Sequence, residues 1–175
     1  AHTKAGELAV EVDGGTVWMD MAPPRVLRKL TEAEWPALYA AYGLTEADRP
    51  DDLTPWIVST GLADIMMPVR SHERLMQAVQ DEAAVTALSR QYDVTGVHMF
   101  CPGGDSCTAY CSNYALTYYL YSHGLVEPLA ENVFIQGEHM ARPSRICSRL
   151  YRDGDTVTVR IGGSAVMSMV CEIQI

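Results

Sequence analysis

A short polar segment in the second half of the chain combines residue types that could carry out acid/base chemistry on a bound anion. It precedes and enters a helix predicted over Thr108–His123 and ended by Gly124. The first turn of a helix has unpaired N–H groups and the positive end of the helix dipole, so it favours a thiolate and binds anions. Cys111 is therefore the candidate acid/base group. The candidate donors to a substrate carboxylate are Ser106, Thr108, Ser112 and Asn113.

Other roles for this segment stay open. Cys111 is equally compatible with a small core-facing residue at a helix start, or with a side chain that contacts substrate without reacting. The bulk of Tyr110 argues against a closely approaching substrate. Cys101, Cys107, Cys111 and His98 could suggest a zinc site. Their spacing is not that of a zinc knuckle, however, and the sequence has no second Cys-x-x-Cys pair. We expect no metal and, without a glycine-rich phosphate loop, no nucleotide cofactor.

Two further groups lie outside this segment. Arg142 is a candidate substrate contact, with a turn-shaping role before Pro143 as the alternative. His98 lies in an apolar, strand-like run and is expected to be a hydrogen-bonded core residue. The tyrosine-rich face of the predicted helix is interpreted mainly as core packing.

The elements that must position these residues are predicted from periodicity and turn chemistry. Alternation predicts a hairpin over residues 7–21, strands at 56–59, 64–69 and 94–100, and a C-terminal meander of strands at 133–136, 145–152, 156–161 and 165–175. Helices are predicted over 31–42, 71–80 and 81–92, the first with Thr31 and Glu34 as a capping box. Strands outnumber helices and tight turns join neighbouring strands, which favours a largely antiparallel α+β domain.

Composition excludes several classes of protein. The 175 residues suit one domain, and the formal charge of −9 argues against a nucleic-acid partner. There is neither a secretory pattern at the start nor an apolar run of about 20 residues, so we expect a cytoplasmic protein. The cysteines Cys101, Cys147 and Cys171 lie in apolar runs and are expected to act as small hydrophobes.

Four blocks resemble the PhzF-like isomerase family in order and spacing. Residues 136–144, Gln-Gly-Glu-His-Met-Ala-Arg-Pro-Ser, match that family's Gln-Gly-x-x-Met-Gly-Arg-Pro-Ser segment, with Ala141 in place of the second glycine. The other three are the Thr-Lys-Ala-Gly-Glu-Leu stretch that begins at Thr3, the Ser-Thr-Gly of 59–61 with Met67-Pro68-Val69, and Gly162-Gly163 within 159–166. Together they cover nearly the whole chain.

The resemblance implies a diaminopimelate epimerase-like fold, in which a curved, mostly antiparallel sheet wraps around a central helix, here 108–123. It also implies cofactor-independent proton transfer on a small carboxylic or amino acid, in secondary-metabolite biosynthesis. The segment before the helix departs from the family pattern: the family's aspartate, glycine and serine fall on Ser106, Tyr110 and Cys111. Thr108-x-x-Cys111 instead resembles the epimerase branch, whose cysteine shuttles a proton.

The family's acid/base glutamate belongs to a first domain that this chain does not resemble. Residues 1–22 are therefore expected to be a strand pair at the junction with that domain, and residues 23–175 the C-terminal PhzF-like domain. Three hypotheses follow: a second polypeptide supplies the missing domain, the half forms a homodimer through its cleft face, or it is a catalytically degenerate ligand-binding or partner subunit. Whether the chain is an active enzyme stays open at this point.

Overall fold

The computed structural model describes residues 2–3, 6–103, 106–109, 113–165 and 170–172, and its main feature is one large sheet. Its strands are β3 (Val10–Asp13), β4 (Thr16–Asp20), β5 (Arg25–Lys29), β6 (Trp56–Ser59), β7 (Ala63–Pro68), β8 (Gly96–Gly103), β9 (Ser106–Ala109), β10 (Glu131–Gln136), β11 (Ser144–Asp153) and β12 (Thr156–Ser164). They lie in the order β3-β4-β12-β11-β10-β9-β8-β7-β6-β5, while β1 (His2–Thr3) and β2 (Gly6–Glu7) pair separately. The pairs β7–β8 and β9–β10 are parallel and the others antiparallel, which confirms the predicted mostly antiparallel sheet.

Two of the described helices, α2 (His72–Gln77) and α3 (Glu82–Tyr92), begin where side-chain caps satisfy their first N–H groups. The other helices are α1 (Trp35–Ala40) and α4 (Asn113–Ser122), with short 3-10 turns η1 (Glu32–Glu34), η2 (Glu46–Asp48) and η3 (Glu138–Met140). The predicted capping box of Thr31 and Glu34 is confirmed. Ser71 caps α2, and Asp81 accepts hydrogen bonds from two N–H groups of α3.

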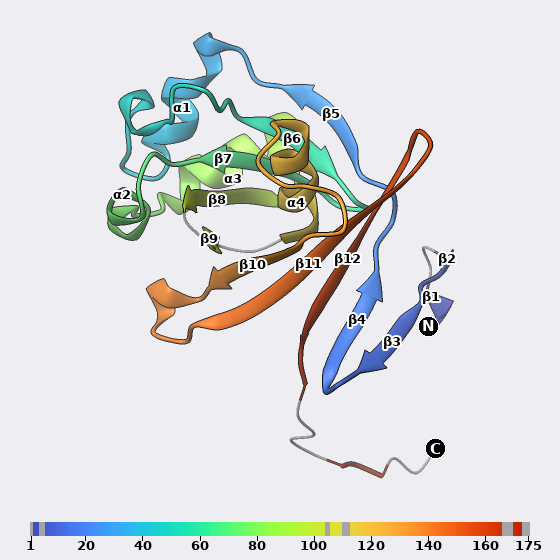
Figure 1. Ribbon diagram of the computed structural model, residues 1–175. Coiled ribbons are helices and arrows are strands. Elements are labelled where there is room, and N and C mark those ends of the chain that lie inside the picture. Colours follow the sequence, from blue (N-terminus) through green and yellow to red (C-terminus); the bar gives the residue numbers. More distant parts are fainter. Residues whose placement is uncertain (1, 4–5, 104–105, 110–112, 166–169, 173–175) are drawn as a thin grey trace.

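The central strands are buried on both faces, so helices cover the sheet on two sides (Figure 1). On β7, Ile65 and Met67 face a core shared with α1, α2 and α3, whereas Met66 faces a second core shared with α4. The sheet curls around α4, whose buried residues include Leu116, Tyr119 and Leu120. This arrangement confirms the α+β class with a sheet wrapped around a central helix. No helix among the described residues is long and apolar enough to cross a membrane.

Three predicted elements need correction. The central helix begins at Asn113 and not at Thr108, because residues 106–109 form strand β9, which is hydrogen-bonded to β8 on one side and β10 on the other. The described residues of the predicted last strand, 165 and 170–172, form no strand, and Cys171 is exposed. Strand β5 was missed because it is polar and exposed and carries a bulge between Val26 and Arg28.

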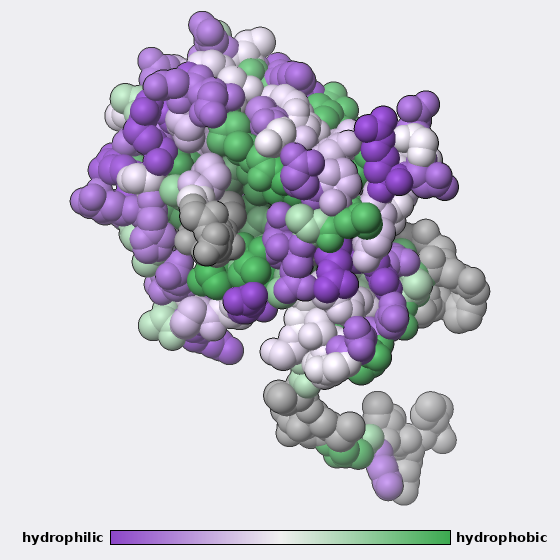
Figure 2. Space-filling model, in the orientation of Figure 1, coloured by the Kyte–Doolittle hydropathy of each residue, from purple (hydrophilic) through white to green (hydrophobic). Residues whose placement is uncertain are grey.

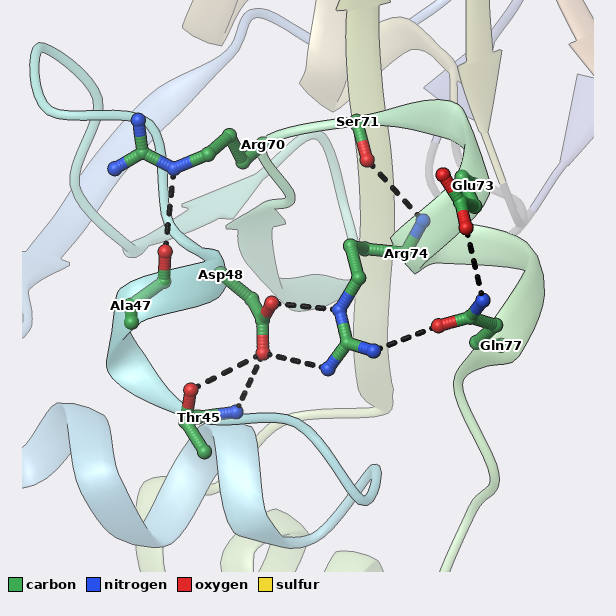
Figure 3. A network of polar contacts seen from close by, with 8 residues as sticks. All are labelled: Thr45, Ala47, Asp48, Arg70, Ser71, Glu73, Arg74 and Gln77. Carbon is green, nitrogen blue, oxygen red and sulfur yellow. Dashed lines mark hydrogen bonds and ion pairs between the residues drawn. The ribbon is translucent and has the colours of Figure 1, made fainter.

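A polar network joins η2 to α2 and thereby fixes the position of α2 (Figure 3). Asp48 accepts hydrogen bonds from Nε and Nη2 of Arg74 at 2.7 and 3.0 Å, and from the backbone and side chain of Thr45 at 2.9 and 3.2 Å. Arg74 also donates to Gln77 at 2.6 Å. The hydrogen bonds from Arg74 lower the pKa of Asp48 to about 2.

We expect Asp48→Asn to lower the free energy of unfolding at neutral pH by about 1 to 2 kcal/mol, after allowance for the half-exposed Arg74. Because the folded-state pKa lies below the ordinary value of 3.8, the contribution is present above that value and is lost as the pH falls towards 2. The difference between wild type and variant in urea unfolding should therefore shrink as the pH falls from about 5, above the ordinary pKa, to about 2, the folded-state pKa. Asp51→Asn, which removes a fully exposed partner of Arg70, is the control and should have a smaller effect. An unchanged difference across this range would contradict the role given to Asp48.

Candidate functional site

The start of α4 is the place where the structure brings predicted site residues and the family-like 136–144 block together. Asn113 is the first residue of α4, and strands β9 and β10 run in parallel towards it, with Thr108 opposite Ile135. Thr108 is therefore a strand residue, which corrects its predicted place at the first position of the helix, and Ser106, predicted to precede the helix, lies in the same strand. Cys111 and Ser112 lie outside the described residues.

Asn113 combines near-complete burial with an incomplete set of hydrogen bonds. Its side chain is 3% exposed, and its Nδ2 donates to Oε1 of Gln136, the last residue of β10, at 2.8 Å. Its Oδ1 is buried and has no hydrogen-bond partner among the described residues. A buried amide oxygen without a hydrogen-bond donor lowers the stability of the folded state unless a ligand or another group donates to it. Asn113 thus combines an amide nitrogen fixed by Gln136 with a buried oxygen that can accept a further hydrogen bond.

Gln136 was not predicted as a site residue. It is the first residue of the Gln-Gly-…-Arg-Pro-Ser block, so the motif marked its position. What the sequence did not reveal is that β10 ends beside the start of α4, which places the two amides in contact.

A buried hydroxyl pair fixes α4 along the sheet just beyond this point. Thr117 donates from Oγ1 to the backbone oxygen of Asn113 at 2.7 Å, one helical turn earlier, and its Oγ1 lies 2.7 Å from Oγ of Ser148 on β11. Both side chains are fully buried. With the Thr117 proton used on Asn113, the hydroxyl of Ser148 is the donor to Thr117. The pair therefore sets the axial position of Asn113.

The turn between β10 and β11 is held by backbone geometry and by one long-range contact. Gly137 has φ of 84°, and a side chain there would overlap the backbone oxygen of Arg142, so only glycine fits. Nε2 of His72 lies 3.2 Å from Oε2 of Glu138, which ties the turn to the start of α2. Arg142 is exposed on this turn. Its guanidinium is therefore available to an anion, and the shape of the turn comes from its backbone.

Three titratable side chains of the sheet are disfavoured in their charged forms. His98 is fully buried, and desolvation lowers its pKa to about 3, so it is neutral. Burial raises the pKa values of the Cys101 and Cys147 thiols, which fits the small-hydrophobe role predicted for them. Asn113 and Gln136 can bind and orient a ligand but cannot exchange protons at neutral pH.

No protein-family model and no curated protein matches this chain. Solved structures do match it. A phenazine biosynthesis protein of the PhzF family from Bacillus anthracis superposes with a TM-score of 0.73 at 16% identity, over 92% of this chain and 63% of its own. A predicted epimerase from Pseudomonas aeruginosa gives a TM-score of 0.72 at 22% identity, over 90% of this chain and 58% of its own.

A hydroxyproline epimerase from Agrobacterium vitis with bound trans-4-hydroxy-L-proline is a more distant match. Its TM-score is 0.57 at 13% identity, over 93% of this chain and 55% of its own. At these identities the likeness concerns the fold, and it confirms the predicted PhzF-like, diaminopimelate epimerase-like fold. The chain spans about three fifths of the length of the first two structures.

We expect Thr117→Val to lower the free energy of unfolding by about 1 to 3 kcal/mol, because it leaves the buried hydroxyl of Ser148 without its partner. Ser148→Ala alone should cost a comparable amount. The double variant Thr117→Val/Ser148→Ala removes both hydroxyls, so its loss should be smaller than the sum of the single losses. Urea unfolding of the four proteins measures the coupling, and strictly additive losses would contradict the pairing.

Proposed function

We propose that this chain is the C-terminal half of a PhzF-like isomerase, acting without a cofactor by proton transfer on a small carboxylic or amino acid. The observation that carries the proposal is the buried, partly unpartnered amide of Asn113 at the start of the central helix of a PhzF-like fold. The bound amino acid of the Agrobacterium vitis epimerase supports this substrate class. Biosynthesis of a secondary metabolite in the cytoplasm is the setting we propose.

The binding step uses the end of the sheet where β10 meets α4. A substrate carboxylate would accept hydrogen bonds from N–H groups at the helix start, where the dipole favours negative charge. Asn113 would accept a hydrogen bond from the substrate's amino or hydroxyl group through Oδ1, with Nδ2 held by Gln136. Ser106, Thr108 and Ser112 are proposed as further contacts from the same segment. The exposed guanidinium of Arg142 would neutralise an approaching anion.

The chemical step requires a base near the carbon beside the carboxylate. We propose the thiolate of Cys111 for this role: it takes the proton from carbon, the electron pair moves into the carboxylate as an enediolate, and the proton returns to carbon. Helix-start N–H groups would stabilise the enediolate charge. A second acid/base group on a facing wall would be needed to deliver the proton from the opposite side.

The facing wall is proposed to come from another polypeptide chain, either a second copy or a separate chain carrying the missing domain. In this proposal residues 1–22 mark the junction with that domain. The hairpin β3–β4 in this segment is continuous with the rest of the sheet, because β4 pairs with β12.

A second candidate function is favoured by the residues that depart from the family pattern in the segment before α4. The family's aspartate and glycine fall on Ser106 and Tyr110. These departures favour a catalytically degenerate half that binds a ligand or a partner subunit without turning substrate over. The two functions differ in whether the protein exchanges a carbon-bound proton.

We expect the protein to exchange the α-proton of an accepted acid for deuterium in D2O. Loss of the Hα signal in proton NMR measures this exchange. The probes are a panel of 2-amino and 2-hydroxy acids, with trans-4-hydroxy-L-proline as the first. Cys111→Ala should lower the exchange rate by about 100-fold or more, since it removes the base. Cys171→Ala, which removes an exposed thiol elsewhere, should leave the rate unchanged. Exchange that persists in Cys111→Ala would exclude the thiolate, and a wild type inactive on the whole panel would favour the binding subunit.

We expect Asn113→Ala to weaken binding of trans-4-hydroxy-L-proline by about tenfold, the value of one buried hydrogen bond. The measurement is isothermal titration calorimetry. Asn132→Ala on β10 is the matched control, because its exposed amide bonds only to the nearby Ala130 backbone. Equal affinities for the two variants would show that Asn113 does not contribute to binding of this ligand.

A further inference from the structure

A surface cavity lies between α1, η2 and the segment that joins β7 to α2. Its volume is about 370 Å³, which is at the lower end of the range of small-molecule sites, about 300 to 1,000 Å³. The protein surface around α1 is mostly hydrophilic (Figure 2). α1 packs in the core that it shares with α2 and α3, whereas α4 lies in the other core, so this cavity is distinct from the candidate site. The outer hollow, as we call it, is lined mainly by Glu32, Trp35, Glu46, Arg49, Asp51 and Arg70.

Arg49 is held firmly in the outer hollow, yet part of its guanidinium has no partner. Nη1 donates to three backbone oxygens, those of Pro50, Asp51 and Leu53, at 2.5, 3.2 and 2.7 Å. The guanidinium also lies 4.4 Å from the centre of the Trp35 ring. Among the described residues no hydrogen bond starts from Nε or Nη2; Nε is buried, whereas Nη2 is not. This edge of a guanidinium matches a carboxylate, which accepts two parallel hydrogen bonds from it and would satisfy the unpaired N–H groups.

The charges that line the outer hollow are only partly paired with one another. Arg70 and Asp51 form an ion pair, with Nη2 and Oδ1 at 2.7 Å. Glu32 and Glu46 are exposed, and neither side chain has a hydrogen bond or an ion pair within the described part of the chain. The groups left for a ligand are therefore the guanidinium edge of Arg49 and two carboxylates. They call for a ligand that carries both signs of charge.

We propose that the outer hollow binds a free α-amino acid with an apolar side chain, in its zwitterionic form. Its carboxylate accepts hydrogen bonds from Nε and Nη2 of Arg49, and its ammonium group is bound by Glu32 and Glu46. Its side chain rests on Trp35 and Ala47, the apolar residues of the lining. An anion alone would be repelled by the two glutamates, and an amine alone would leave the Arg49 edge unpaired. An α-amino acid satisfies both requirements within a cavity of this size.

The probe is L-leucine, and the measurement is an NMR titration that follows the indole N–H signals of the three tryptophans. We expect the Trp35 signal to shift and to saturate with a Kd of about 0.1 to 1 mM, while those of Trp18 and Trp56 stay in place. The variant Trp35→Phe identifies the signal. 4-Methylpentanoic acid lacks the ammonium group of leucine, and 3-methylbutylamine lacks its carboxylate. Each should bind about tenfold more weakly than L-leucine, because one set of charged hydrogen bonds is lost.

The double variant Glu32→Gln/Glu46→Gln should raise the Kd for L-leucine about tenfold, since it removes both partners of the ammonium group. Both residues are exposed, so the fold should be unaffected. Glu127→Gln is the matched control: Glu127 is also exposed but does not line the outer hollow, and its loss should leave the Kd unchanged. Arg49→Lys keeps the charge but loses the two-pronged edge, so it should also weaken binding about tenfold. Circular dichroism melting checks that this variant still folds.

Several results would overturn the proposal. They are a Trp35 signal that stays in place up to about 20 mM L-leucine, an amine or acid analogue that binds as tightly as L-leucine, and equal Kd values for the double variant and Glu127→Gln. Asn113→Ala separates this site from the proposed isomerase. A shift that persists in Asn113→Ala belongs to the outer hollow, and a shift that is lost in it would assign the binding to the candidate site instead. Absence of α-proton exchange contradicts only the isomerase.

Discussion

Enclosure of α4 by the curled sheet is the constraint on which the other features of this molecule depend. The helix contributes Ala115, Leu116, Tyr119 and Leu120 to a core that includes Phe100 and Phe134. Each large buried side chain contributes about 1.5 to 3 kcal/mol, so this core outweighs any single polar contact. The buried contact between Thr117 and Ser148 adds a directional hydrogen bond to this packing and fixes the axial position of the helix. The start of α4 is thereby held beside the end of β10.

The supports of the candidate site come from distant parts of the chain. Asp48 and Arg74 hold α2 against η2, His72 at the start of α2 contacts Glu138, and Glu138 follows the Gln136–Gly137 corner. Gln136 in turn holds the amide of Asn113. Each contact is local, yet together they link residues 45–48 to the start of α4. A site built in this way is rigid on the side that the described chain provides.

How far the sequence predicted this structure depends on the range of each interaction. Caps such as Thr31 with Glu34, and turns such as Gly14-Gly15, are decided within a few residues, so the elements that they bound were predicted well. Residues 108 and 109 were assigned to the helix that follows them. The pairing of β9 with β8 and β10 depends on residues up to 27 positions away and outweighs local preference. The contact of Gln136 with Asn113 escaped prediction for the same reason, whereas the family motif located both sequence blocks and the fold.

Ala141 stands at a position where the family has glycine. Its φ of 53° is a left-handed conformation that costs an ordinary residue about 1 kcal/mol. The turn nevertheless keeps its shape, because Gly137 and the bonds from Met140 and Arg142 to its backbone oxygen define it. The backbone of the turn therefore accommodates alanine in place of glycine. The changes at Ser106, Tyr110 and Cys111 are of another kind, because they replace the groups that would touch a substrate.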